Sequence, residues 1–372
     1  MSEAAAATVF AVSVENPRAA RRIRAWLITI ALFICAMVMI GGATRLTDSG
    51  LSITEWRPVS GVLLPLSEEA WLEEFIRYQG IPEYQIVNQG MSIDEFKTIY
   101  AWEWVHRNFG RLIAVAFLLP LAYFVAAGAA RGRLAARLAA IFLIGGAQGL
   151  AGWYMVQSGL EEGVDVSQYR LAVHLVLAFL ILGAILWTVF DLSPRTAPRR
   201  GPAPRGALSA AILLGGVLLQ VIAGAFVAGL RAGRSYNTWP LMDGALIPDG
   251  LAAIEPWYLN LSENVLTVQF DHRMLAYLLL AAALAHWRLL PAELRKGPAG
   301  TGALAVMILI ALQIALGVAT VILAAPLALG LLHQAGALAV FAAALHHLHH
   351  LHHLHRLRRG AAQDSAQAAA SA

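Results

Sequence analysis

Eight long apolar runs, separated by shorter polar segments, dominate this sequence. A helix of about 20 apolar residues crosses the hydrocarbon core of a bilayer. The sequence therefore predicts eight membrane-spanning helices, near residues 23–43, 107–129, 135–157, 170–190, 207–230, 268–290, 301–324 and 327–347. Only 13% of the 372 residues are charged and 59% are apolar, whereas a soluble domain carries about 25% charged residues. This composition excludes a soluble enzyme and predicts an all-α integral membrane protein.

The distribution of Lys and Arg predicts the orientation of these helices. More than half of the 27 basic residues lie in the two chain ends and in the loops near 131–137, 195–205 and 288–296. Because Lys and Arg favour the cytoplasmic side, we expect both termini in the cytoplasm and no nucleic-acid partner. The long loops 44–106 and 231–267 then face the opposite side. Around Trp71 the first loop predicts a short amphipathic helix, either at the membrane interface or in solvent.

The chain repeats one plan in two halves. A Pro- and Arg-rich segment at 191–206 separates the first four spans from the last four. The matching positions are His106-Arg107 and His272-Arg273, Gln148 with Gly152 and Gln313 with Gly317, His174 and His333, and Gly42 and Gly224. Four spans per half give both halves the same orientation, so their pseudo-symmetry axis runs along the membrane normal. We expect two pseudo-symmetric four-helix bundles at 23–190 and 207–348, a cytoplasmic tail at 1–22, a cytoplasmic linker at 191–206, and a His-rich, disordered cytoplasmic tail at 349–372.

Histidines point to the chemistry. His106, His174, His272 and His333 stand at the outer ends of the second, fourth, sixth and eighth spans, and His286 lies near the inner end of the sixth, where we expect it at the interface. Ionisable residues inside a membrane usually mark a site. Two histidines at one depth on neighbouring helices are suitable axial ligands for haem iron. The sequence thus predicts one bis-histidine haem site per half, His106 with His174 and His272 with His333.

Two other interpretations of the histidines are weaker. A hydrogen-bonded core residue is a fair, though less favoured, explanation of any single one, but it does not explain four at matching depth. Zinc requires four ligands, or an open site with acids or thiols, and each pair supplies only two donors. Cys35 is the only cysteine and lies inside an apolar run, which excludes an intramolecular disulfide and a CxxC motif.

The two predicted sites differ at one position. Glu103 stands three residues before His106, whereas Gln269 stands three residues before His272. Residues three apart share a helical face, so the first site has a proton acceptor that the second lacks. This difference favours chemistry in the first half and electron storage or transfer in the second. The alternative is an interfacial ion pair between Glu103 and Arg107, four residues later.

Two further groups of residues have open roles. Six arginines are predicted at or near the outer surface, where they either bind haem propionates or only anchor the helices: Arg45, Arg107, Arg111, Arg231, Arg234 and Arg273. The run from Leu345 to His355 repeats Leu-His-His. It is suited to metal binding, although an irregular exit from the last span is the preferred interpretation, with disorder over 360–372.

Taken together, the eight spans, Glu103-Trp-Val-His106-Arg107, Gln269-Phe-Asp-His272-Arg273 and the partners His174 and His333 resemble the haem A synthase family over nearly all of residues 23–348. The resemblance implies an oxidoreductase that converts a ring methyl of haem O into the formyl group of haem A, for terminal oxidases. By the same resemblance, His272 and His333 would bind the iron of a resident haem b as its axial ligands. His106 and His174 would bind the iron of the substrate haem, with Glu103 in catalysis.

The resemblance carries further expectations. The family's proposed route is successive hydroxylation of the methyl group, followed by loss of water from a gem-diol. Because this chain lacks the cysteine pairs of some members, it is similar to the cysteine-free branch found in alphaproteobacteria and mitochondria, and no thiol-based step is expected. We expect a bacterial inner-membrane protein surrounded by lipid, with haem O synthase as a partner. The electron acceptor and homo-oligomer formation stay open.

Two other functions compete with this interpretation. A dihaem b-type electron-transfer cytochrome would bind two haems and transform neither, but it predicts two equivalent sites, against the difference between Glu103 and Gln269. A haem or small-molecule transporter predicts broken helices and polar residues near the midplane. The spans of this chain are unbroken, and their polar groups collect at one end.

Overall fold

The computed structural model of this protein describes residues 16–58, 60–161, 163–193 and 206–370. Within these ranges the chain is helical, with no β-structure beyond an isolated bridge between Met242 and Ala245. Most of the linker predicted at 191–206, and residues 1–15 of the N-terminal tail, lie outside the described residues. The all-α prediction is confirmed for the part of the chain that the structure describes.

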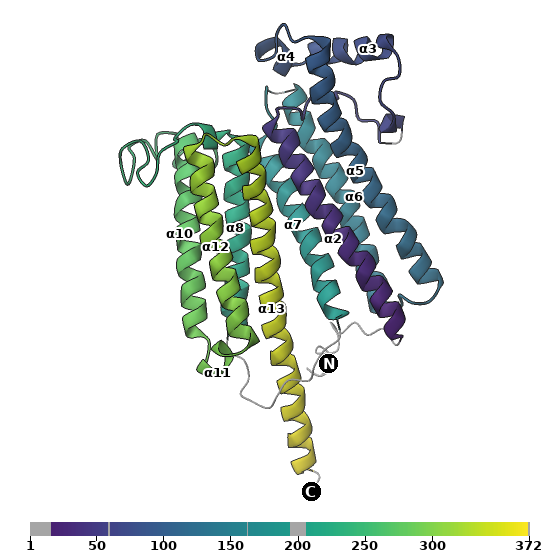
Figure 1. Cartoon of the computed structure of the whole chain (residues 1–372), viewed down its shortest axis with the longest axis vertical. Coiled ribbons are helices and arrows are strands. Elements are labelled where there is room, and N and C mark those ends of the chain that lie inside the picture. Colours follow the sequence, from purple (N-terminus) through teal and green to yellow (C-terminus); the bar gives the residue numbers. More distant parts are fainter. Residues whose placement is uncertain (1–15, 59, 162, 194–205, 371–372) are drawn as a thin grey trace.

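Eight long helices form the body of the molecule (Figure 1). They are α2 (Pro17–Leu46), α5 (Ile93–Ala126), α6 (Gly132–Glu161), α7 (Gln168–Asp191), α8 (Ala207–Gly229), α10 (Val265–Leu289), α12 (Pro298–Ile322) and α13 (Leu327–Ala370). Among the described residues, seven of these helices are long and apolar enough to cross a membrane, and α10 is the exception. Polar residues explain the exception, since α10 contains Gln269, Asp271, His272 and Arg273 in its first turns.

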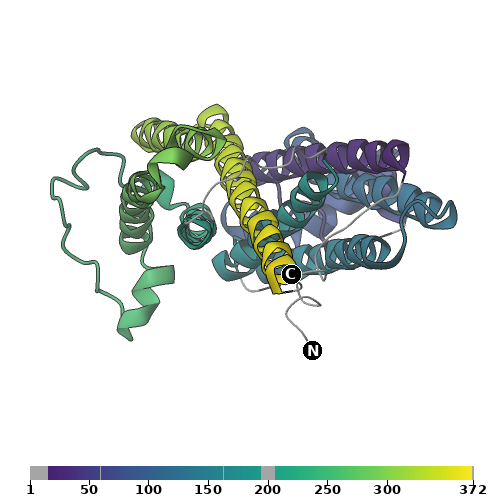
Figure 2. The same ribbon diagram turned by 90° about the horizontal axis from the view of Figure 1, so that it is seen from below.

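The helices pack as two sets that meet along α7, α8, α2 and α13. In one set α2 packs against α5 and α7, and α6 packs against α5 and α7. In the other set α8 packs against α10 and α13, and α12 packs against the same two helices. Seen from below, α13 passes between the sets and contacts both (Figure 2). At this contact the Gln334 amide of α13 donates to the Val38 carbonyl of α2 over 2.9 Å.

Helix α5 begins far earlier than the span predicted at 107–129. Ser92 caps it with a reciprocal pair of hydrogen bonds: the Ser92 hydroxyl accepts from the Glu95 amide, and the Glu95 carboxylate accepts from the Ser92 amide. Such a capping box satisfies two of the free amides at a helix start. Because α5 starts at Ile93, Glu103 and His106 both lie well inside a continuous helix rather than at its entrance.

A small helical layer covers one end of the first set of helices (Figure 1). It consists of α3 (Glu68–Gln79) and α4 (Pro82–Ile86), and α3 confirms the amphipathic helix predicted around Trp71. An aromatic cluster holds this layer on α5, with Phe75, Tyr78 and Phe96 buried at its centre. This packing therefore holds the segment between α2 and α5 against the first turns of α5.

The C-terminal helix differs from its prediction. Helix α13 continues from Leu327 to Ala370, through the Leu-His-His run for which an irregular exit was expected and into the segment for which disorder was expected. His346 and His349 pack their rings on Phe190, at centroid distances of 5.0 and 5.4 Å, and His349 contacts Asp191 at 3.0 Å. The histidines of the run therefore continue the helical contact between α13 and the end of α7.

Candidate functional site

Each of the four predicted site histidines lies against a glycine of a neighbouring helix. A Cβ atom added to that glycine would approach the histidine Cε1 to 2.9–3.2 Å, closer than side chains normally pack. The pairs are Gly41 of α2 with His106 of α5, Gly152 of α6 with His174 of α7, Gly224 of α8 with His272 of α10, and Gly317 of α12 with His333 of α13. The missing side chains let each imidazole approach the adjacent helix closely.

This arrangement corrects one detail of the predicted repeat. Gly41, rather than Gly42, is the counterpart of Gly224, because Gly41 is the glycine that contacts the histidine. Gly42 instead faces α13, where a Cβ atom would overlap the Gln334 side chain. Adjacent helical residues point about 100° apart, so the two glycines serve different neighbours.

The structure brings the histidines together in the two predicted pairs. The ring centroids of His272 and His333 lie 6.3 Å apart, and the two ring planes are inclined at 72°. His106 and His174 are close enough to interact electrostatically. The Nδ1 atoms of His106 and His174 are buried without a hydrogen-bond partner. Two imidazoles brought together from neighbouring helices are what axial ligation of one haem iron requires.

Glutamines hold three of the four histidines. Each glutamine stands four residues before a contacted glycine and donates its amide N–H to the backbone carbonyl of the histidine. The distances are 3.0 Å from Gln148 to His174, 2.9 Å from Gln220 to His272, and 2.7 Å from Gln313 to His333. Sequence analysis noted Gln148 and Gln313 but missed Gln220. The recurring Gln-x-x-x-Gly spacing is the signal that identifies it.

Glu103 is buried and fully hydrogen-bonded. One carboxylate oxygen accepts from the Ser52 hydroxyl and the Ile53 amide, each over 2.7 Å. The other accepts from Nε and Nη2 of Arg107, over 3.1 and 2.7 Å. The ion pair weighed as the alternative is therefore present, and Glu103 also ties the loop around Ile53 to α5. Sequence analysis missed Ser52 and Ile53, because nothing in their local pattern points to α5.

Gln269 has the opposite hydrogen-bond role in the second set of helices. Its amide N–H donates to the Ala232 carbonyl over 2.8 Å, and its amide oxygen accepts from Arg273 over 3.0 Å. Arg273 also donates to the carbonyls of Tyr236 and Thr238. A carboxylate cannot replace this amide, since it has no proton to donate to Ala232. The loop at Ile53 presents an N–H donor to Glu103, whereas the loop at Ala232 presents a carbonyl acceptor to Gln269. This difference between the loops explains the difference between the two side chains.

The six arginines predicted at or near the outer surface all bind protein groups. Arg45 and Arg231 share Asp165, with shortest distances of 3.2 and 2.8 Å, and both also contact Asp48. The hydrogen bonds from Asp165 raise the pKa of Arg231 above its ordinary value. This network joins α2 and the loop before α7 to the loop after α8. Of the remaining four, Arg107, Arg111 and Arg273 donate to loop carbonyls, and Arg234 donates to the Leu46 carbonyl.

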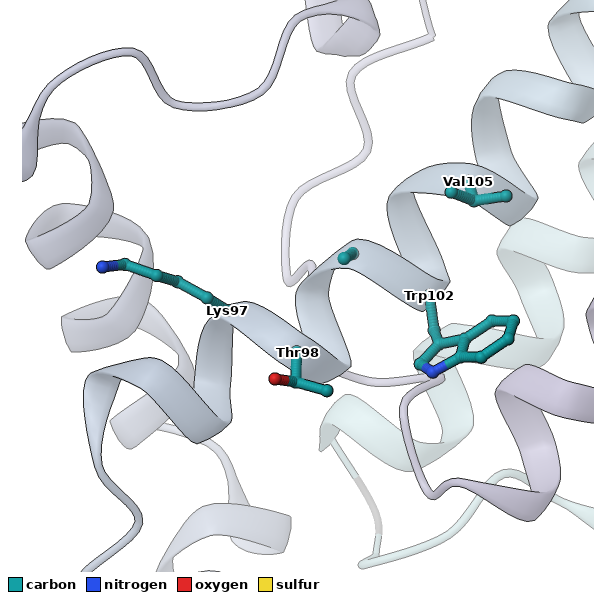
Figure 3. Close-up of a pocket in the computed structure, with 5 residues that line it drawn as sticks. Lys97, Thr98, Trp102 and Val105 are labelled. Atoms are coloured by element: carbon teal, nitrogen blue, oxygen red, sulfur yellow. The ribbon is translucent and has the colours of Figure 1, made fainter. Parts of the chain in front are cut away.

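Two further features lie outside the pairs. His286, near the end of α10, is buried: its Nε2 lies 2.7 Å from Nε2 of His347, and its Nδ1 lies 2.8 Å from the Ser209 hydroxyl. On α5 a hollow of about 480 Å³ is lined by Lys97, Thr98, Ala101, Trp102 and Val105 (Figure 3).

The donor sets favour a centre that needs two axial ligands. In the part of the chain that the structure describes, no group of three or more His, Cys, Asp or Glu side chains is placed to hold a metal ion. Each histidine pair offers two nitrogens and close helix packing, which suits a flat macrocycle whose iron takes one imidazole from each side. The residues present therefore fit haem.

The fold and the site define a helical protein with several membrane-spanning segments and paired histidines inside its helix packing. The chain belongs to the family described as cytochrome oxidase assembly protein, which it matches over residues 24–345. Among curated relatives, haem A synthase of Azorhizobium caulinodans is 53% identical over 338 residues, covering 90% of this chain and 95% of the relative. Haem A synthases of Parvibaculum lavamentivorans and Sinorhizobium fredii are 52% and 49% identical, over 87% and 88% of this chain and 92% and 89% of the relatives.

Proposed function

We propose that this protein is a haem A synthase, which oxidises a ring methyl of haem O to a formyl group. The support is the name shared by relatives about half identical to nearly the whole chain. The observation that carries the proposal is the presence of two histidine pairs in one chain, each enclosed by glycine contacts. As a half-reaction, the methyl group and one water give the formyl group, four protons and four electrons.

The two pairs take different roles in this proposal. His272 and His333 hold a resident haem b as its axial ligands, which supplies a one-electron redox centre when bound. His106 and His174 hold the iron of the substrate haem. The difference between Glu103 and Gln269 supports this assignment, because only the first pair has a carboxylate one turn away on the same helix.

Glu103 lies one helical turn from His106 on α5, with both carboxylate oxygens occupied by four hydrogen bonds. The same contacts hold the loop around Ile53 over the outer end of α5. We propose that Glu103 serves catalysis by fixing this loop and the Arg107 guanidinium beside His106.

The membrane arrangement follows from the same proposal. Helix α10, the sixth long helix along the chain, brings the number of spans to eight, because its 25 residues reach across a bilayer and its polar turn carries His272. Residues 23–190 and 207–348 are two pseudo-symmetric halves joined by a cytoplasmic linker, both termini are cytoplasmic, and the protein lies in the bacterial inner membrane. Haem O synthase is the expected source of the substrate.

Paired histidine variants test the assignment of the two sites. His333→Ala is expected to abolish haem b retention in purified protein. His174→Ala is expected to retain one haem b per chain and to form no haem A, measured by pyridine haemochrome spectra and mass analysis of extracted haem. A dihaem electron-transfer cytochrome predicts instead that both variants lose one haem b each and that wild-type protein forms no haem A. Loss of one haem b from each variant, with no haem A formed by the wild-type protein, would refute the proposal.

A further inference from the structure

The loop that joins α8 to α10, residues 230–264, differs from the layer of α3 and α4 over the first set of helices. That layer is held on α5 by a buried aromatic cluster. The structure describes the α8–α10 loop over its whole length, and none of its residues belongs to a buried apolar cluster. Its helical turns are η3 (Ala232–Arg234), η4 (Trp257–Leu259) and α9 (Asn260–Glu263). The α8–α10 loop is therefore not held by an apolar core of its own.

Large apolar side chains of this loop are exposed instead. Leu246 and Ile247 are 75% and 72% exposed, and Trp257 and Tyr258 are each exposed over more than half of their surface. The other large apolar side chains exposed in this loop are Trp239, Leu241 and Leu261. Exposed apolar side chains gathered on one segment mark a surface that lipid or another protein covers.

The position of the loop favours lipid. Figures 1 and 2 both show that it projects sideways beyond α10, on the side away from the first set of helices. In Figure 1 it lies beside the ends of α10 and α12 rather than above them. The neighbouring helices α8, α12 and α13 are long and apolar enough to cross a membrane. A segment beside their ends therefore meets the surface of the bilayer that surrounds them.

Hydrogen bonds attach the start of the loop to the flank of α10. Arg273 holds the backbone carbonyls of two loop residues, as described above. One turn further along α10, the Trp239 indole N–H donates to the Tyr277 hydroxyl over 2.9 Å. Tyr277 stands twelve residues after the start of α10, about 18 Å along the helix. Leu278, which follows it, is 64% exposed, so the loop continues a helix flank that is open to lipid.

The charges of the loop indicate which kind of lipid contact it makes. Between residues 235 and 264 there is no Lys or Arg, and the four acids are Asp243, Asp249, Glu255 and Glu263. Glu263 accepts a hydrogen bond from Tyr169 of α7 over 2.8 Å, so it faces the helices. An acidic segment is not attracted to anionic headgroups. Its contact with lipid therefore depends on the apolar and aromatic side chains, and Trp and Tyr favour the membrane interface.

We propose that the α8–α10 loop is a membrane anchor, whose apolar side chains insert into the leaflet at the end of the molecule where the four site histidines lie. Leu246 and Ile247 enter the boundary between headgroups and acyl chains, about 5–10 Å below the surface. The anchor keeps the segment 236–239 against α10, directly after His272. Lipid contact thus supports the helix turn that carries one member of the second histidine pair.

Fluorescence quenching in the full-length protein tests the anchor. Cys35→Ala removes the only cysteine of the chain, and Ile247→Cys then carries an environment-sensitive NBD label in phosphatidylcholine nanodiscs. The two quenchers are aqueous iodide and a phosphatidylcholine with a nitroxide at the upper end of its acyl chain. We expect a blue-shifted emission that the nitroxide lipid quenches strongly and iodide quenches weakly.

Asp94→Cys is the matched control, because its side chain is exposed at the start of α5, well before the apolar run of that helix. Its label should show the reverse, with strong quenching by iodide and weak quenching by the nitroxide lipid. Equal iodide quenching at Ile247 and Asp94 would place the loop in water and overturn the proposal. Protection of the Ile247 label from both quenchers would also overturn it, since protein rather than lipid would then cover the loop. Leu246→Cys supplies a second reporter if Ile247→Cys does not fold.

Discussion

Replacing Glu103 with glutamine should loosen the loop around Ile53 as well as affect turnover. The carboxylate accepts four hydrogen bonds, two from Arg107 and two from the Ser52 hydroxyl and the Ile53 amide. The new amide nitrogen turns away from the Arg107 cation and faces the loop. The Ser52 hydroxyl can turn its proton to the Ser49 carbonyl, 3.0 Å away, and accept a hydrogen bond from the new glutamine amide. The partly buried Ile53 N–H cannot, so it is left without an acceptor.

The magnitude follows from these contacts. An unpaired buried N–H costs about 1–3 kcal/mol, and a hydrogen bond to a charged group contributes more than its neutral replacement by about 1 kcal/mol. We expect the loop to lose roughly 2–4 kcal/mol of local stability. Hydrogen exchange of the Ile53 amide in detergent-solubilised protein measures this directly, with Gln269→Glu as the matched change in the second half. Unchanged protection of Ile53 in Glu103→Gln would refute the hydrogen-bond reasoning.

Three further predictions address the outer layer and the helix contacts. Burial raises the pKa of Glu83 to about 7, so its contribution to stability is complete below pH 4.5 and is lost as the pH rises through 7. Thermal unfolding of Glu83→Gln should therefore vary less between pH 5 and 8, by up to roughly 3 kcal/mol, and an unaltered pH profile would contradict this. Gly152→Ala, which places a Cβ atom 2.9 Å from His174 Cε1, should lower haem content, whereas Gly149→Ala, with open space around it, should not; equal haem loss in both would show that the contact is irrelevant. Asp165→Asn should lower the unfolding temperature by the equivalent of about 1 kcal/mol at low salt and by less at high salt, because Arg45 and Arg231 lose their shared, partly exposed carboxylate.

Sequence patterns were most informative where one helix determines the outcome. Apolar runs predict the positions of the long helices, because the membrane requirement acts on each run separately. The histidine pairs were also predictable, since matching depth in two halves depends only on spacing along each helix. Helix α5 starts some fourteen residues before the predicted span, because its first turns carry exposed charged residues such as Asp94 and Lys97, which extend the helix but not the apolar run.

Contacts between segments that are far apart along the chain could not be predicted from the sequence. Gly41 and Gly42 are equivalent in composition, and only the packing of α2 between α5 and α13 decides which one contacts His106. Ser52 and Ile53, which donate to Glu103, lie about fifty residues earlier in an irregular loop, and no periodic pattern in the sequence marks them. The glutamine support is an intermediate case: its four-residue spacing to glycine is visible in the sequence, but its meaning depends on which carbonyl the amide reaches.

The haem content of the purified protein tests the central claim most directly. The chain is expressed with a supply of haem O, and the haems are extracted, identified by mass and counted per chain. The account predicts one haem b per chain together with haem O, haem A or a hydroxylated intermediate. Two haem b per chain, with haem O available and no modified haem present, would contradict it and identify an electron-transfer cytochrome instead.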